Sequence, residues 1–236
     1  MNTEKNFIIS KKVDHSANIS SLYFSKKENN FGDFIAGQYV TIYIPELGIP
    51  EGKSYSISSA PHENEFVITI KKMGLFSNYL CDLSAGDTVS MSDPYGFFYP
   101  DEDGRGALVC IAGGIGITPF RSIILDELKK KSKRNIFLYY SSKTKDDLVF
   151  FEDFKNIADT YKNVHLFFHI TGERIPQNPF FIQGRISPQN ILKNYEQEIA
   201  NSEFLLCGSI GFVKDMWKGL KNNGIPEFNI YTESFY

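Results

Sequence analysis

The apolar pattern of the chain changes at residues 100–106 (PDEDGRG), a polar stretch suited to a linker. Before this stretch, short segments rich in Ile, Val, Tyr, Phe and Thr recur roughly every ten residues, bounded by Gly, Pro, Asn or Asp. After it, uninterrupted apolar segments alternate with amphipathic helical ones. The two patterns predict two domains, which we place at residues 1–102 and 103–236.

The first domain is expected to be a six-stranded antiparallel β-barrel, because short strands at regular spacing are typical of small barrels. One interruption, residues 77–86 (SNYLCDLSAG), has Leu80 and Leu83 at helical spacing and Gly86 as a stop, which predicts one short helix. The expected strands are residues 6–14, 20–26, 37–45, 53–59, 65–72 and 86–94.

The second domain is expected to be a doubly wound parallel α/β domain, because strands alternate with helices along it. Residues 107–114 (ALVCIAGG) form a continuous apolar run, as expected of a strand that is buried on both faces. The other expected strands are residues 135–142, 164–171, 203–209 and 228–235, and the expected helices are residues 118–132, 148–162, 187–200 and 211–224.

Composition excludes several classes of protein. The formal net charge of −3 provides no basic field for a nucleic acid partner. The 42% hydrophobic and 22% charged residues are typical of a globular protein rather than a disordered one. The apolar run at residues 7–9 is too short for a signal peptide, and no window approaches the ~18 apolar residues of a membrane span.

The cysteines and histidines predict neither a disulfide scaffold nor a metal site. Cys81, Cys110 and Cys207 are odd in number and far apart, which also argues against an iron–sulfur cluster. His165 and His169 lie in an expected strand, on the same face but too far apart to share a metal. The expected setting is the reducing cytoplasm.

A glycine-rich turn joins the first strand and the first helix of the second domain. Gly113, Gly114 and Gly116 precede that helix, with Thr118 as its expected N-cap and Pro119 at its first position. Backbone N–H groups at such a turn favour a phosphate, although Pro119 replaces the third glycine of the usual dinucleotide fingerprint. A purely structural tight turn remains the alternative.

Other strand ends strengthen the prediction of a nucleotide site. Ligands of open parallel sheets bind at the carboxyl ends of the strands. The glycine turn, residues 141–143 (SSK) and residues 207–209 (CGS) all fall at such ends.

A second phosphate site is predicted in the barrel, where residues 71–80 read KKMGLFSNYL. Gly74 and Ser77 stand at the start of the expected short helix, where the N–H groups of Phe76 and Ser77 face an anion. The alternative is that Ser77 only caps the helix.

Five segments in order resemble the ferredoxin–NADP⁺ reductase superfamily. They are KSYSISS (53–59), GLFSNYL with the following GD and DPYGFF (74–98), AGGIGITPF (112–120), LLCGS (205–209) and the terminal ESFY. The resemblance covers the whole chain, with the barrel first and the nucleotide domain second. Its middle segments are most similar to the reductase modules of bacterial oxygenases, flavohaemoglobins and small ferredoxin or flavodoxin reductases.

The resemblance implies that the barrel binds FAD. In that family an Arg-x-Tyr-Ser segment holds the flavin, so Tyr55 is expected against the isoalloxazine or ribityl chain and Ser56 near flavin N5. Lys53 stands where the family usually has Arg, and is expected at the FAD pyrophosphate as a point charge without the bidentate fork. The second pyrophosphate segment of the family is matched by Gly74, Phe76 and Ser77.

The resemblance also implies a pyridine-nucleotide site in the second domain. Gly114, Gly116 and Thr118 match its loop, and Cys207 with Gly208 matches the pair near the nicotinamide. At the end of the chain, Glu233 and Phe235 match an E-x-F pattern whose aromatic ring shields the flavin. Tyr236, the last residue, is the alternative for this role, because related reductases end in a stacking Tyr. Ser56, Cys207 and Glu233 are therefore the residues expected closest to hydride transfer.

The implied reaction passes a hydride from NAD(P)H to FAD and then electrons, one at a time, to an acceptor. The chain is expected to be a bare reductase and a monomer whose acceptor is a separate ferredoxin or flavodoxin, or, as second choice, an oxygenase component. The alternatives are a free flavin or quinone reductase and a non-catalytic flavin subunit that relays electrons.

Coenzyme choice is predicted from the loop after the second strand of the nucleotide domain. Ser142, Lys143 and Lys145 lie there, and the first carboxylate is Asp146. Basic and hydroxyl groups favour the 2′-phosphate of NADPH, whereas an acidic residue favours NADH. NADPH is therefore expected, with a solvated polar loop as the alternative.

Overall fold

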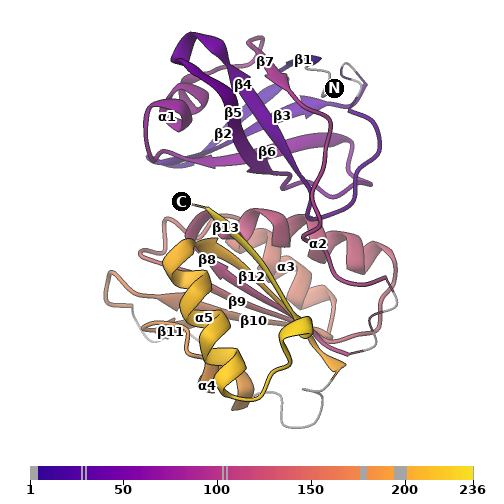
Figure 1. Ribbon diagram of the computed structural model, residues 1–236, viewed down its shortest axis with the longest axis vertical. Coiled ribbons are helices and arrows are strands. Elements are labelled where there is room, and N and C mark those ends of the chain that lie inside the picture. Colours follow the sequence, from indigo (N-terminus) through magenta and orange to yellow (C-terminus); the bar gives the residue numbers. More distant parts are fainter. Residues whose placement is uncertain are drawn as a thin grey trace. The chain divides into compact units, whose positions relative to one another are not determined.

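The structure is a computed structural model that describes residues 5–27, 29, 31–102, 104, 106–175, 180–193 and 201–235. Contacts between residues divide the chain into two compact units, Met1–Phe97 with Thr118–Lys130 and Phe98–Ile117 with Lys131–Tyr236. Figure 1 shows their elements, coloured along the sequence. The domain boundary after residue 102 stays a prediction.

The first unit contains two antiparallel sheets, in the strand orders β1-β7-β4-β5 and β2-β3-β6. A bridge between Ile57 and Ile68 links the end of β5 to β6 and thus joins the sheets. The antiparallel β architecture predicted for this half is confirmed. The strands are β1 (Lys5–Ile8), β2 (Lys11–Ser16), β3 (Ile19–Ser25), β4 (Tyr39–Ile44), β5 (Ile49–Ser56), β6 (Glu65–Lys71) and β7 (Thr88–Met91).

The first predicted strand is divided into β1 and β2. The Ile9 N–H donates to the Asp87 carbonyl at 2.9 Å, whereas the Ser10 N–H donates to the Tyr23 carbonyl at 2.8 Å. Adjacent residues therefore bond to different sheets, so the single predicted strand is two strands in the structure.

Aromatic rings fill the core of the barrel. The Phe31 ring stacks between Phe66, at 4.0 Å between centroids, and Phe7, at 4.3 Å. Phe24 meets Phe31 edge-on at 5.9 Å. Stacked and edge-on pairs are the arrangements that aromatic rings prefer. The high phenylalanine content of this half therefore serves packing.

Helix α1 (Leu75–Asp82) begins two residues before the predicted start and ends before Gly86. Gly74 is its N-cap, and Leu83 has an extended backbone (φ −64°, ψ 157°) that stops the helix. Gly86 lies instead in the turn before β7, with φ +95°. The predicted helix is thus present, but its stop signal belongs to a turn.

The second unit is built on a six-stranded parallel sheet in the order β11-β10-β9-β8-β12-β13. This order confirms the predicted doubly wound domain, because the chain starts in the middle and builds outwards in both directions. The strands are β8 (Leu108–Gly113), β9 (Ile136–Ser142), β10 (Val164–Ile170), β11 (Phe181–Gln183), β12 (Glu203–Ser209) and β13 (Ile230–Phe235).

The predicted helices are present as α2 (Thr118–Lys129), α3 (Phe151–Thr160), α4 (Pro188–Lys193) and α5 (Ile210–Asn222). The predicted third helix extends to residue 200, and its part from residue 194 lies outside the described residues. Helix α5 buries Val213, Met216 and Leu220 in the core that β8 and β12 form on one face of the sheet.

Helix α2 follows the glycine turn but belongs by its contacts to the first unit. The Arg121 guanidinium pairs with both Glu63 carboxylate oxygens, at 2.8 and 3.1 Å. It also donates to the Ser58 carbonyl at 3.0 Å, and the Ser122 hydroxyl donates to the Ser59 carbonyl at 2.6 Å. These bonds fix α2 to the turn after β5.

No helix in the described part of the chain is long and apolar enough to cross a membrane.

Candidate functional site

Strand β5 and helix α1 bring together the two segments predicted to hold a pyrophosphate. Lys53 and Tyr55 alternate with Ser54 along β5 and so share one face of the strand. On that face the Tyr55 ring stacks on Phe76 of α1, with 6.3 Å between centroids and 22° between planes. Segments separated in the sequence therefore meet in one place within the first unit.

The start of α1 is arranged around the Ser77 side chain. Its hydroxyl oxygen accepts the N–H groups of Met73, at 2.8 Å, and of Gly74, at 3.1 Å. Ser77 therefore stabilises the helix start, as the alternative to a phosphate site predicted, although the N-cap residue itself is Gly74. The first helical bond, from Asn78 N–H to the Gly74 carbonyl, is 2.9 Å long. The N–H groups of the first helical turn, which precede Asn78, have no partner within the helix and point out of its N-terminal end.

The approach to this helix end is open. A Cβ built on Gly74 would meet no atom within 4 Å, so nothing nearby blocks a ligand at this position. The positive end of the helix dipole and the Lys53 ammonium both favour an anion. The residues therefore fit the pyrophosphate of FAD.

Ser56 lies on the other face of β5 and is only 3% exposed. Its partner across the strands is Tyr39, whose ring lies 4.4 Å from that of Tyr95. The Tyr39 ring covers Gly96, where an added Cβ would come within 2.8 Å of it, and φ is +116°. Tyr39 and Tyr95 thus form an aromatic wall beside Ser56 that the sequence reasoning missed.

The glycine turn of the second unit forms a 3₁₀ turn, η2 (Gly114–Ile117), that continues directly into α2. Thr118 is therefore the first residue of the helix and is buried, so the prediction that it is the N-cap was wrong. Because the 3₁₀ turn continues into the helix without a break, Thr118 does not occupy the N-cap position. Gly114 has φ +57°, and a Cβ there would face open space.

Packing accounts for the other glycines around this turn. A Cβ on Gly116 would lie 2.3 Å from the Cys207 carbonyl oxygen, and one on Gly113 would lie 2.8 Å from the Phe212 ring. A Cβ on Gly208 would also approach Phe212, to 2.9 Å. The turn therefore packs directly on the end of β12. This is the point where strand order reverses, the usual ligand crevice of such sheets.

Cys207 is fully buried at this point. Burial raises the pKa of its thiol well above the ordinary value, and the nearby Glu233 carboxylate raises it further. The thiol therefore stays protonated and does not act as a nucleophile.

The end of β13 lies beside the end of β12. Glu233 pairs with Cys207, and Phe235 pairs with Ser209. Of the three residues predicted closest to hydride transfer, Cys207 and Glu233 are thus neighbours within the second unit, and Ser56 belongs to the first unit. Tyr236, the other candidate for the stacking ring, lies outside the described residues.

The loop after β9 carries the residues predicted to read the coenzyme. Ser142 is buried, and its carbonyl accepts the Thr171 N–H at 3.0 Å. Lys143 and Lys145 are exposed. The sequence reasoning missed Glu173, whose carboxylate accepts the Lys145 N–H at 2.7 Å.

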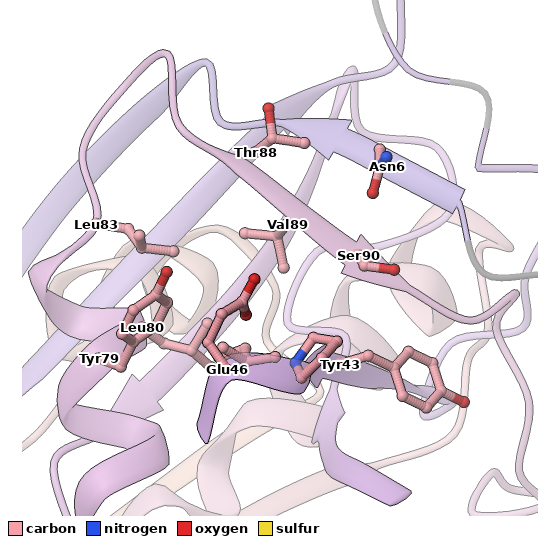
Figure 2. Close-up of a pocket in the computed structure, with 11 residues that line it drawn as sticks. Asn6, Tyr43, Glu46, Tyr79, Leu80, Leu83, Thr88, Val89 and Ser90 are labelled. Carbon is pink, nitrogen blue, oxygen red and sulfur yellow. The ribbon is translucent and has the colours of Figure 1, made fainter. Parts of the chain in front are cut away.

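A cavity of about 330 Å³ lies elsewhere in the first unit, next to α1 (Figure 2). Its walls come from β1, β4, β7, α1 and the turn after β4, and none of the residues predicted to bind a cofactor lines it. The lining residues are Asn6, Tyr43, Ile44, Pro45, Glu46, Tyr79, Leu80, Leu83, Thr88, Val89 and Ser90. Among the described residues, no group of His, Cys, Asp and Glu is arranged to hold a metal.

Two family models match the chain. The oxidoreductase FAD-binding domain matches residues 6–99, and the oxidoreductase NAD-binding domain matches residues 110–218. A flavohemoprotein of Bacillus subtilis is 30% identical over 239 residues, which cover 98% of this chain and 59% of that protein. The chain thus spans about three fifths of this curated relative.

Solved structures share the fold over the full length of the chain. The FAD/NAD-binding domain of nitric oxide dioxygenase from Vibrio cholerae superposes with a TM-score of 0.85 at 24% identity, covering 100% of this chain and 99% of that one. A ferredoxin NADP⁺ reductase from Neisseria gonorrhoeae, with bound FAD and NADP, gives a TM-score of 0.80 at 21% identity and covers 100% of both chains.

Proposed function

The chain carries an oxidoreductase FAD-binding domain followed by an oxidoreductase NAD-binding domain, and from this premise we propose that it is an FAD-containing NAD(P)H reductase of the ferredoxin–NADP⁺ reductase superfamily that delivers electrons from NAD(P)H to a separate acceptor protein. A ferredoxin or flavodoxin is the first choice, and an oxygenase component is the second. We expect a monomer that works in the cytoplasm.

The observation that carries this proposal is the contact between Tyr55 and Phe76. It joins the strand bearing Lys53 to the open start of α1, so that a charged side chain and a helix N-terminus serve the same diphosphate. FMN has no pyrophosphate, so the arrangement favours FAD.

The residues of the barrel bind and orient the cofactor. Lys53 would neutralise the pyrophosphate, and Tyr55 would pack against the ring system or its ribityl chain. Ser56, buried on the opposite face of β5, keeps its role near flavin N5 as an expectation from the resemblance. Bound FAD supplies the hydride acceptor and the route for the electrons.

The residues of the second unit bind and orient the coenzyme. The glycine turn at Gly114 and Gly116, which leads into Thr118, would hold its diphosphate, and the Cys207–Gly208 strand end would position the nicotinamide. From the resemblance, the Phe235 ring at the end of β13 would be the one that shields the flavin. No general base is needed, because hydrogen leaves the nicotinamide together with its electron pair and no proton has to be abstracted.

The purified protein is expected to be yellow and to release FAD, not FMN, when it is heated. Anaerobic titration with NADPH or NADH should bleach the bound flavin. Bound FAD that neither coenzyme bleaches would favour the non-catalytic relay instead. Steady oxidation of NAD(P)H by free flavin or quinone, with no protein captured from its own cell extract by the reduced form, would favour a reductase for small acceptors.

Lys53→Ala is expected to weaken FAD binding about ten- to a hundredfold, the usual value of one charge-assisted hydrogen bond. Lys53→Arg should keep or tighten binding, because the guanidinium offers two donors to the diphosphate. The measurement is the FAD dissociation constant by fluorescence. Lys27→Ala removes an exposed lysine of the same unit and is the control. Equal affinities in Lys53→Ala and the control would remove Lys53 from the site.

A further inference from the structure

Two neighbouring elements hold the short segment that follows β5. The Ser58 N–H donates to the Val67 carbonyl of β6 at 2.9 Å, and the Ser59 hydroxyl oxygen accepts the Val67 N–H at 3.0 Å. From helix α2, the Arg121 guanidinium donates to the Ser58 carbonyl at 3.0 Å, and the Ser122 hydroxyl donates to the Ser59 carbonyl at 2.6 Å. The backbone of this segment is therefore bonded to both β6 and α2.

Glu63 extends this hold to the next residue of the segment. Its carboxylate accepts the Ala60 N–H at 2.6 Å and also pairs with the Arg121 guanidinium, at 2.8 and 3.1 Å. One guanidinium thus binds a carbonyl of the segment directly and holds the carboxylate that binds its amide. All of these residues belong to the first unit.

The Arg121–Glu63 pair is largely shielded from water. The two side chains are 16% and 30% exposed, so mobile ions screen their attraction less than that of a surface pair. Burial by itself raises the pKa of the Glu63 carboxyl, but the hydrogen bonds and charge of Arg121, together with the Ala60 N–H, bring this pKa below its ordinary value. The carboxylate is therefore ionised near neutral pH, and its bonds to the guanidinium are charge-assisted.

We propose that Arg121 is a positioning residue for the flavin: through Glu63 and the Ser58 carbonyl, it fixes the backbone directly after Ser56. This inference rests on the proposed function, in which Ser56 is expected near flavin N5. Ser56 is buried at the end of β5, two residues before Ser58, so a shift of the Ser58 backbone displaces it. The diphosphate sites expected at Lys53 and at the start of α1 do not depend on this pair.

Arg121→Gln tests the proposal in the FAD-loaded protein. The amides of Ser58 and Ala60 should exchange hydrogen about tenfold faster or more, the usual effect of losing a charge-assisted hydrogen bond. The visible circular dichroism of the bound flavin should change. Flavin reduction by NAD(P)H should slow about tenfold, as for a misplacement of less than 1 Å. The dissociation constant of FAD and the KM for the coenzyme should change less than about twofold, because the diphosphate sites stay intact.

Arg121→Lys is the conservative variant. It keeps the positive charge but replaces the guanidinium fork by a single ammonium, so its exchange, spectrum and rate should lie between those of wild type and Arg121→Gln. It also decides the question if Arg121→Gln does not fold. Asp126→Asn is the matched control, because it removes another ion pair of α2, Lys130 with Asp126 at 2.8 Å, and should leave all three measurements unchanged.

The outcomes separate this proposal from the proposed function. Faster exchange of Ser58 and Ala60 with an unchanged flavin spectrum and reduction rate would show that the pair only stabilises the turn, and would overturn the role of Arg121. Unchanged exchange in both Arg121 variants would overturn it as well. A wild type whose bound flavin is bleached by neither coenzyme would instead overturn the proposed function, while exchange and circular dichroism would still report on Arg121.

Discussion

Replacing Glu203 with alanine is expected to lower the free energy of unfolding of the second unit by about 3–5 kcal/mol, the usual result of removing one partner of a buried ion pair. Glu203 Oε2 lies 2.7 Å from Arg134 Nη1, and the two side chains are only 8% and 4% exposed. Its other oxygen accepts the Asp101 N–H at 2.8 Å. The variant therefore leaves a guanidinium in a site with little water to solvate it.

Hydrogen exchange of the β12 amides during urea unfolding measures this effect locally, which is preferable to a global midpoint for a chain with two units. Glu227→Ala is the matched control, because Glu227 pairs with Lys221 at a similar distance, 2.8 Å, but on the surface. Loss of this surface ion pair should lower the free energy of unfolding by about 1 kcal/mol or less. Similar losses in the two variants would mean that burial does not set the strength of the Arg134 pair.

The parts of the fold that could be predicted are those whose burial produces a recognisable apolar pattern in the sequence. Strands β8, β9 and β12 are buried on both faces and appear as continuous apolar runs. Strand β11 was not predicted, because its three residues lie at the sheet edge and are half-buried or exposed. Its Gln183 side chain donates to the Glu173 carbonyl, a bond that no local pattern indicates.

The site was predictable where its residues are adjacent in sequence and not where the fold assembles them. Lys53 and Tyr55 stand in one motif, but the Tyr39–Tyr95 wall depends on the pairing of β4 with a distant segment. Glu173 likewise reaches Lys145 only through the alignment of two strands. The sequence did contain one indication of the aromatic wall: Gly96 follows Tyr95, and a glycine often marks a position where another group packs close to the backbone.

The Thr118 error has a similar cause. Thr-Pro before an apolar run is a reasonable sign of a helix start. Here the chain is already in the 3₁₀ turn η2 before Thr118, and Gly116 of this turn packs closely on the β12 backbone. Long-range packing therefore places the start of the helical segment earlier than the local sequence predicts.

Gly116→Ala is expected to slow flavin reduction by NAD(P)H by about a hundredfold, the effect of misplacing a bound reactant by roughly 1 Å. The added Cβ would lie 2.3 Å from the Cys207 oxygen, 2.5 Å from its carbonyl carbon and 2.7 Å from the Gly208 nitrogen. All three are backbone atoms, and β12 is held between β8 and β13. The η2 turn must therefore move, and its amides move with it.

Stopped-flow reduction of the flavin measures the rate, and the FAD content of the same sample reports on the barrel. FAD content should stay normal, because Lys53, Tyr55 and Phe76 lie in the other unit. Gly211→Ala is the control, since a Cβ there meets no atom within 4 Å and alanine is favourable inside helix α5. A Gly116→Ala protein that reduces its flavin at the control rate would show that the coenzyme does not depend on this turn. Loss of FAD together with activity would show instead that the damage spreads beyond the second unit.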